Sequence, residues 1–137
     1  MKSRILVVLA AIAILASGCN SVEKIVAKSI LKAEIEEANE DLSGKYVDEI
    51  TIMSSCEFDG KNIIYNYVID EDQVAFDDID RSLLEDNINS LWETNPDLKG
   101  LTHQLNILEG SAIYSYTGSN TGETFSITIH PPKDSGQ

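Results

Sequence analysis

Carboxylates are the most abundant groups in this sequence that could do chemistry, and they crowd into one segment. Asp70-Glu71-Asp72 is followed closely by Asp77-Asp78-Ile79-Asp80. Calcium prefers several hard oxygen ligands of this kind, but the calcium-loop pattern needs an oxygen ligand at its fifth position and a glycine at its sixth. Counted from Asp70, those positions hold Val74 and Ala75. We therefore interpret these carboxylates as residues of a hairpin end and a helix start.

Other candidates for metal binding or nucleophilic catalysis are scattered. His103 and His130 are the two histidines, and Cys56 is distant from both in sequence. A zinc site requires three or four ligands, and the sequence has no Gly-x-Ser-x-Gly elbow, phosphate-binding glycine loop or Cys-x-x-Cys motif. No basic residue stands close to Cys56 to stabilise a thiolate, so we predict a small buried side chain there. The sequence predicts a non-enzymatic protein with no cofactor and no metal site.

Four tyrosines occur as two Tyr-x-Tyr pairs: Tyr65, Tyr67, Tyr114 and Tyr116. If their two strands are neighbours, both pairs can lie on the same face of a sheet. Tyrosine supplies rigid, amphipathic contact area that suits a protein partner, and it also packs beneath helices with its hydroxyl at the edge. The four tyrosines are therefore candidate partner-binding residues, and burial beneath helices is the alternative.

The hydrophobic periodicity around these residues predicts strands and helices that together form an α+β domain. Residues 46–70 and 112–130 each show a hydrophobic period of two, interrupted by a turn signal, and so predict two β-hairpins. Residues 77–93 and 95–110 between them predict two helices, the second starting with an asparagine cap and a proline and closed by Gly110. The predicted order is β-β-α-α-β-β, with a four-stranded antiparallel sheet and helices on one face.

A further helix is predicted over residues 21–43, before the hairpins. Its expected apolar stripe comprises Val22, Ile25, Val26, Ser29, Ile30 and Ala33. Lys24, Lys28 and Lys32 are four residues apart and share one face, whereas carboxylates crowd the far end of the segment. Beside a membrane anchor this lysine row would contact anionic headgroups. The alternative is the ordinary solvated face of a packed helix.

The first residues have the layout of a secretory signal. Lys2 and Arg4 precede an apolar run over 5–16, and small residues follow. The run is too short to span a bilayer, which takes roughly 20 apolar residues. Leu15-Ala16-Ser17-Gly18-Cys19 resembles the lipobox of bacterial lipoproteins, although the commonest pattern puts leucine where this chain has Ala16. The resemblance implies cleavage before Cys19, which would then carry a diacylglycerol and an N-acyl chain.

This resemblance implies a location in the bacterial cell envelope. Asn20 is not aspartate, so the sorting rule of well-studied diderm bacteria implies the outer membrane, facing the periplasm. Loss of the signal would leave eight basic and 23 acidic residues, a net charge of −15, which disfavours nucleic acid and favours a cationic protein partner. The expected organisation is a signal peptide (1–18), a lipid anchor and tether helix (19–45), one α+β domain (46–132) and a short tail (133–137).

These observations predict a lipid-anchored envelope lipoprotein whose small acidic domain binds another envelope protein. The chain resembles small uncharacterised envelope lipoproteins in general and no specific family among them. Its architecture is similar by analogy to that of pilotins, which escort secretin subunits to the outer membrane. This analogy implies an assembly or accessory role.

The alternative function is an inhibitor or immunity protein against a cationic envelope-targeting enzyme such as a lysozyme. The motif of lysozyme-inhibiting lipoproteins is approximately Ser-Gly-x-x-Tyr with a later Tyr-x-x-x-Thr-Lys-Gly. Ser43-Gly44-Lys45-Tyr46 is one residue short of it, and Tyr116 is followed by Thr121-Gly122 at a different spacing and without the lysine. Those roles are therefore not assigned here. An envelope hydrolase ranks third, because carboxylate pairs occur in every acidic domain and nothing singles one out.

Overall fold

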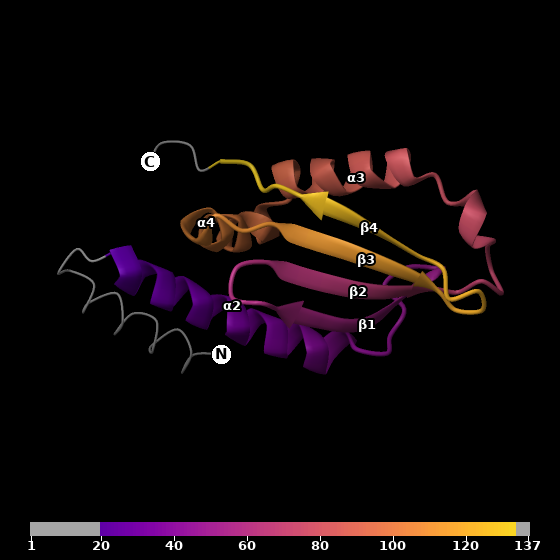
Figure 1. Ribbon diagram of the computed structural model, residues 1–137, viewed down its shortest axis with the longest axis horizontal. Helices are drawn as coiled ribbons and strands as arrows, with labels where there is room; N and C mark the ends of the chain where they lie inside the picture. The colour runs from indigo at the N-terminus through magenta and orange to yellow at the C-terminus, as the bar shows by residue number, and fades with distance from the viewer. Residues whose placement is uncertain (1–19, 134–137) are drawn as a thin grey trace.

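A single four-stranded sheet with helices on one side forms the protein, as the computed structural model shows for residues 20–133 (Figure 1). The predicted α+β class is confirmed. Residues 15–19, which resemble a lipobox, lie outside the described residues. No helix of the described chain is long and apolar enough to cross a membrane. In chain order the elements are α2 (Asn20–Leu42), β1 (Thr51–Phe58), β2 (Ile63–Ile69), η2 (Phe76–Asp78), α3 (Arg81–Thr94), η3 (Pro96–Leu98), α4 (Lys99–Leu108), β3 (Ala112–Gly118) and β4 (Thr124–Ile129).

The central pair of strands corrects the predicted antiparallel sheet. Both hairpins are antiparallel, as predicted, but β2 and β3 run parallel, from Ile63 opposite Ala112 to Ile69 opposite Gly118. The two helices between them carry the chain back to the end of the sheet where β2 began, and parallel neighbours need a crossover of this kind. Hairpin signals are local, so they do not specify the direction of one hairpin relative to the other.

A β-bulge in β1 alters which of its residues face the core. The register shifts between Met53 and Ser55, so Met53 and Cys56 both lie under the helices although they are three residues apart. A bulge inserts one extra residue, and this breaks the strict alternation that the sequence predicted. Cys56 is 2% exposed, as predicted. Burial raises the pKa of its thiol to about 12, so the thiol is protonated at neutral pH.

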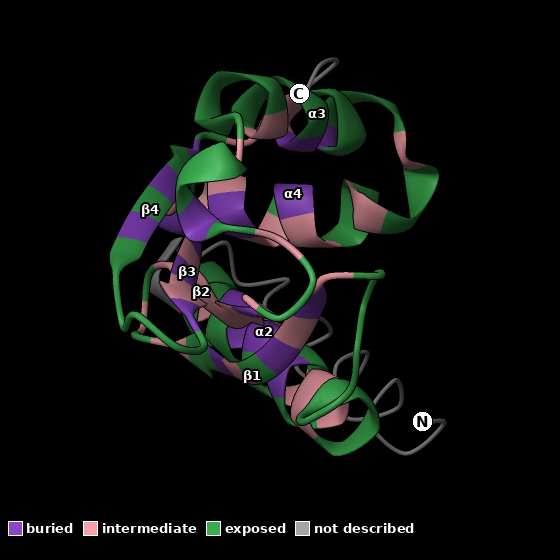
Figure 2. Cartoon of the chain, turned by 90° about the vertical axis from the view of Figure 1, so that its right-hand side faces the viewer, coloured by how far each residue is buried: buried purple, intermediate pink, exposed green. Residues whose placement is uncertain are grey.

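Helix α2 belongs to the same core as the sheet (Figure 2). Its buried stripe comprises Val26, Ala27, Leu31 and Ile35, whereas Ile25 of the predicted stripe is 63% exposed. Val26 of the predicted stripe is buried, but the rest of the buried stripe lies on another side of the helix, because apolar residues occur on more than one side and the periodicity alone does not choose between them. The helix predicted as a tether is thus also a layer of the folded domain.

The second half of α2 covers the outer edge of β1. The Asn39 side chain donates from Nδ2 to the carbonyl of Cys56 and accepts the Cys56 N–H at Oδ1, with both distances 2.7 Å. Backbone bonds from Gly44 to Met53 and from Met53 to Lys45 continue this pairing along the strand. An exposed strand edge invites pairing with other chains. Here side-chain and backbone groups of the preceding segment occupy it.

The two helices after β2 begin at side-chain caps. Asp80 accepts the N–H of Leu83 at 3.1 Å, so α3 starts at Arg81, four residues after the predicted start, and the preceding aspartates lie in η2. Asn95 accepts the N–H of Asp97 at 2.9 Å, which confirms the predicted cap of the next helical segment. Apolar residues on α3 then point towards the sheet, with Ile88 and Trp92 buried.

Helix α4 ends at Leu108, two residues before the predicted Gly110, and its C-cap is Glu109. Glu109 takes the left-handed conformation, with φ 57°, at the end of the helix. A Cβ at Gly110 would overlap the backbone carbonyl of Lys61. Glycine is required here because the end of α4 packs directly against the β1–β2 turn, and a side chain would force the two segments apart.

Candidate functional site

The parallel pairing of β2 and β3 brings the four tyrosines together on the helix-covered face. Tyr65 lies opposite Tyr114, and Tyr67 lies opposite Tyr116. The ring centroids are 4.8 Å apart in the first pair and 5.3 Å in the second, and Tyr67 is 6.0 Å from Tyr114. These separations are typical of favourable aromatic contacts. The two tyrosine strands are therefore neighbours, and all four tyrosines share one face of the sheet, as the sequence analysis considered. The parallel direction of the pairing was not predicted.

Two of these tyrosines belong to the closed part of the core. The hydroxyl of Tyr114 accepts a buried hydrogen bond of 2.9 Å from Nε1 of Trp92. Tyr65 lies opposite the buried Cys56 in the β1–β2 register. Burial raises the pKa of both tyrosines, so both rings are neutral at physiological pH. Tyr114 is buried and Tyr65 half-buried, and neither belongs to the lining of the groove described next.

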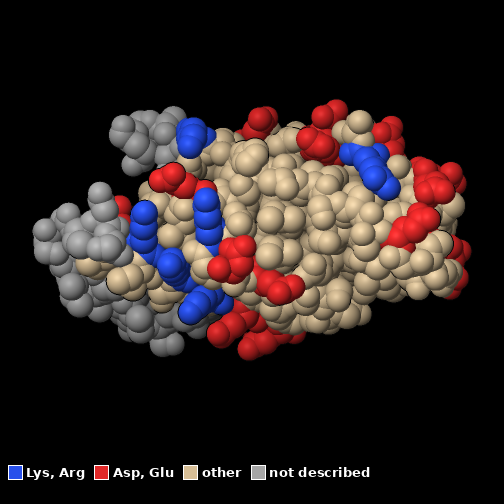
Figure 3. All heavy atoms as spheres, in the orientation of Figure 1, with Lys and Arg blue, Asp and Glu red and all other residues tan. Residues whose placement is uncertain are grey.

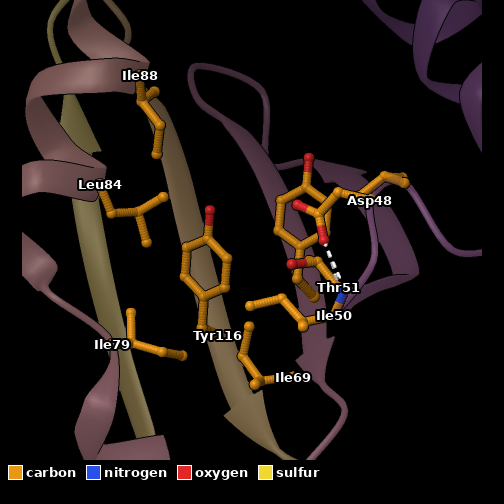
Figure 4. Close-up of a pocket in the computed structure, with 10 residues that line it drawn as sticks. Asp48, Ile50, Thr51, Ile69, Ile79, Leu84, Ile88 and Tyr116 are labelled. Atoms are coloured by element: carbon orange, nitrogen blue, oxygen red, sulfur yellow. Dashed lines mark hydrogen bonds between the residues drawn. The ribbon is translucent and has the colours of Figure 1, made fainter. Parts of the chain in front are cut away.

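Tyr67 and Tyr116 instead line a groove between α3 and the start of β1 (Figure 4). The groove has a volume of about 270 Å³, slightly below the roughly 300 Å³ at which small-molecule pockets begin. It is therefore suited to one or two side chains of a peptide. Its other lining residues are Val47, Asp48, Ile50, Thr51, Ile69, Ile79, Leu84 and Ile88.

The hydroxyls of Tyr67 and Tyr116 are unpaired polar groups of a half-buried and a buried residue, respectively. Within residues 20–133 neither hydroxyl has a hydrogen-bond partner, and neither oxygen is completely buried. Burial raises the pKa of both, and neighbouring tyrosines and the Asp48 carboxylate raise it further. Both groups are consequently protonated at neutral pH and can donate a hydrogen bond to a carbonyl in the groove.

Asp48 places a carboxylate at the rim of this groove. Its Oδ1 accepts the N–H groups of Ile50 at 2.9 Å and Thr51 at 2.8 Å (Figure 4). The same loop is tied to the end of β2, because the Tyr46 hydroxyl donates to Oδ2 of Asp70 at 2.6 Å. The resulting site has a fixed negative charge on one side and the aliphatic side chains of α3 on the other. It can accommodate an apolar group next to a cation.

The crowded carboxylates serve turns and helix starts, as interpreted from the sequence. Oε1 of Glu71 accepts the N–H groups of Asn120 at 2.6 Å and Thr121 at 2.7 Å, which attaches the β3–β4 loop to the turn after β2. These donors lower the pKa of Glu71. Asp70 and Asp80 are used by Tyr46 and the α3 cap. In the described part of the chain, no three His, Cys, Asp or Glu residues lie together as a metal site would require.

A serine–histidine contact that the sequence did not reveal lies at the opposite end of the sheet. Oγ of Ser111 is 3.0 Å from Nδ1 of His130, beside a second cavity of about 440 Å³. The N–H of Ser111 is used by Oδ1 of Asn62 and that of Gly110 by the carbonyl of Leu105. Neither N–H can serve as an oxyanion donor. Ser111 and His130 stand next to the paired residues Ala112 and Ile129 of β3 and β4. Knowledge of this strand register would have predicted the contact.

Some of the remaining predicted site residues lie in the described part of the chain and others lie outside it. Lys24, Lys28 and Lys32 are exposed on the first half of α2, next to the buried stripe of that helix. Cys19, the predicted site of lipid attachment, lies outside the described residues. His103 is exposed on α4, in a different element from His130.

Comparisons with known proteins find a shared fold and no shared function. No protein-family model and no curated protein sequence matches the chain. A crystal structure of a Pseudomonas aeruginosa protein inferred to be secreted superposes with a TM-score of 0.61. The two sequences are 11% identical, and the match covers 78% of this chain and 91% of that one. At this identity the similarity shows a shared fold, and function has to be argued from the site.

Proposed function

We propose that this protein is a lipid-anchored lipoprotein of the bacterial envelope whose domain binds a basic segment of another envelope protein, without catalysis or cofactor. The groove carries the binding part of the proposal, because the unpartnered hydroxyls of Tyr67 and Tyr116 lie beside Asp48 and an apolar wall. The lipobox resemblance supports an acylated Cys19 and an outer-membrane location. The shared fold with a protein inferred to be secreted supports a position outside the cytoplasm.

The chemistry of the groove specifies what the bound segment has to offer. Ile79, Leu84 and Ile88 form an aliphatic wall, so the segment presents an apolar side chain. The tyrosine hydroxyls donate to its backbone carbonyls, and the Asp48 carboxylate attracts a lysine or arginine next to the apolar residue. The net charge of −13 also steers cationic partners towards the protein. The proposed occupant is therefore a peptide segment with adjacent apolar and basic residues.

A titration with two matched peptides tests this specificity. We expect acetyl-Gly-Leu-Lys-Leu-Gly-amide to shift the amide NMR signals of Thr51, Ile69 and Leu84, and the same peptide with glutamate in place of lysine to leave them unchanged. Asp48→Asn removes the charge but keeps an oxygen for the Ile50 and Thr51 N–H groups. It should weaken binding of the lysine peptide about threefold to tenfold. Equal binding of both peptides, or shifts confined to another surface, would contradict the groove assignment.

Photo-crosslinking in cells then identifies the partner. A benzoylphenylalanine at Val47, which lines the groove and is 42% exposed, should trap one envelope protein, and trapping should be lost in Asp48→Asn. The same probe at the exposed Ser126, on the opposite face of the sheet, should not trap it. Trapping from both positions equally, or trapping that survives Asp48→Asn, would refute the groove as the contact.

The identity of the trapped protein decides between the accessory role and the alternative. The acidic net charge favours a cationic enzyme as a second candidate target. If the trapped protein is a cationic hydrolase such as a lysozyme, and the purified domain lowers its activity, the protein is an inhibitor. If it is a membrane assembly protein that the domain does not inhibit, the accessory role stands.

A further inference from the structure

Lysines gather at one end of this molecule. Their side chains lie together at the end that holds the first part of α2 and the end of the described chain, whereas aspartates and glutamates are the prevailing charged groups over the rest of the surface in view (Figure 3). Along α2 alone, the lysines lie at positions 24, 28 and 32 with Glu23 beside them, and the part of the helix after Lys32 carries Glu34, Glu36, Glu37, Glu40 and Asp41. This separation occurs in a chain with a net charge of −13.

The tertiary structure adds lysines from other segments to the lysine row of α2. Lys61 in the β1–β2 turn and Lys133 after β4 line the same cavity, and the turn lies beside the middle of α2 (Figure 1). Both are exposed. The cavity is held together by a 2.8 Å bond from the Ser111 N–H to Asn62 and a 2.9 Å bond from Asn106 to the Pro132 carbonyl. We call Lys24, Lys28, Lys32, Lys61 and Lys133 the basic end.

We propose that the basic end is a membrane-docking surface, which rests on anionic lipid headgroups and directs the groove away from the bilayer. This inference depends on the proposed function for the lipid anchor at Cys19, the residue directly before α2. An anchor at that position would hold the basic end, rather than any other surface, against the membrane. The groove involves the end of β2 and the start of β1, and both lie at the opposite end of the sheet (Figure 1).

The distances make this orientation effective despite the negative net charge. Helix α2 has 23 residues and is therefore about 34 Å long, several times the screening length of about 8 Å at physiological ionic strength. Carboxylates at the far end are consequently screened from the headgroups. The basic end brings together five exposed lysines, three from α2, one from the β1–β2 turn and one after β4. Each basic residue near an anionic surface favours contact about fivefold.

Amine labelling of the acylated protein in vesicles tests the docking surface. The protein is reconstituted into phosphatidylcholine vesicles and into vesicles with 30% phosphatidylglycerol, and acetylation of each lysine by an N-hydroxysuccinimide ester is followed by mass spectrometry. We expect the five lysines of the basic end to react about tenfold more slowly on the anionic vesicles. Exposed Lys45, just after α2, is the internal control and should react equally on both. Protection should vanish in 1 M salt.

Two matched variants test whether the whole basic end contacts the membrane or only the three lysines of α2. Lys61→Gln with Lys133→Gln should return the labelling rate of Lys24 towards its value on zwitterionic vesicles, whereas Lys45→Gln should not change it. No effect of the double variant, or equal rates on the two vesicle types, would overturn the docking surface. Flotation with the zwitterionic vesicles reports the anchor independently. If the wild type floats no better than Cys19→Ala, the anchor itself is wrong.

Discussion

The two halves of the helix-covered sheet face use the same residue type for different purposes. Tyr114 and Tyr116 are two residues apart on β3 and point to the same side. In the closed half, Trp92 bonds the Tyr114 hydroxyl, and α2 and α4 fill the core around it. In the open half, the Tyr116 hydroxyl has no partner in the described chain and lines the groove. Both rings are buried, so the partner of the hydroxyl, rather than the Tyr-x-Tyr motif, distinguishes the two tyrosines.

The difference between the halves should appear first in stability. Leu31 of α2 is completely buried in the closed half, so Leu31→Ala leaves a cavity and should lower the free energy of unfolding by about 2–5 kcal/mol. The exposed Ile25 on the same helix is the control, and Ile25→Ala should change it by less than about 0.5 kcal/mol. Urea denaturation measures both. Similar effects of the two substitutions would show that α2 is not part of the cooperative core.

A sharper comparison removes one hydroxyl at a time. Tyr114→Phe leaves the buried Trp92 N–H without its acceptor and should cost about 1–3 kcal/mol. Tyr116→Phe removes a hydroxyl with no protein partner, so its effect on stability should stay below about 0.5 kcal/mol, while it weakens binding of the lysine peptide. Denaturation and the NMR titration together give both quantities. The comparison breaks if Tyr116→Phe destabilises the fold as much as Tyr114→Phe.

The smallest expected effect concerns the β3–β4 loop, which is bonded to the Glu71 carboxylate. Backbone donors lower the pKa of Glu71, so its carboxylate favours the docked β3–β4 loop above its ordinary pKa. This contribution disappears as the pH falls through the lowered pKa. The amide NMR signals of Asn120 and Thr121 should therefore titrate with a midpoint below the ordinary glutamate value of about 4.3. Glu71→Gln should abolish this step, and a midpoint at or above that value would contradict the contact.

The hairpins and the start of the second helical segment, at Asn95, were predictable because their signals are local. Asp59 accepts the N–H groups of Lys61 and Asn62 in the β1–β2 turn, and Gly60 has a φ of 100°, as a turn aspartate and glycine at these positions indicate. The asparagine cap before η3 is equally local. In each case neighbouring residues in the chain supply both the donor and the acceptor, so no distant segment has to be known.

Features that depend on distant segments were not predictable in this way. The bulge beside Met53 shows only in the register against β2, and the buried face of α2 is selected by packing against α4 and β1. The Ser111–His130 contact likewise exists only because β3 and β4 are paired. Apolar residues on several sides of a helix leave its orientation open, since burial depends on the surfaces that meet it.

The sequence by itself determined the strands, the helices, the side of each strand that carries its tyrosines and the lysine spacing on α2. The tertiary structure alone decided that β2 and β3 run parallel, that the Tyr114 hydroxyl is bonded by Trp92 while the Tyr116 hydroxyl has no partner in the described chain, and that Lys61 and Lys133 join the lysines of α2. The reason is physical: backbone hydrogen bonds and side-chain periodicity act within short segments. Strand direction, coverage and charge distribution depend on contacts between segments far apart in the chain.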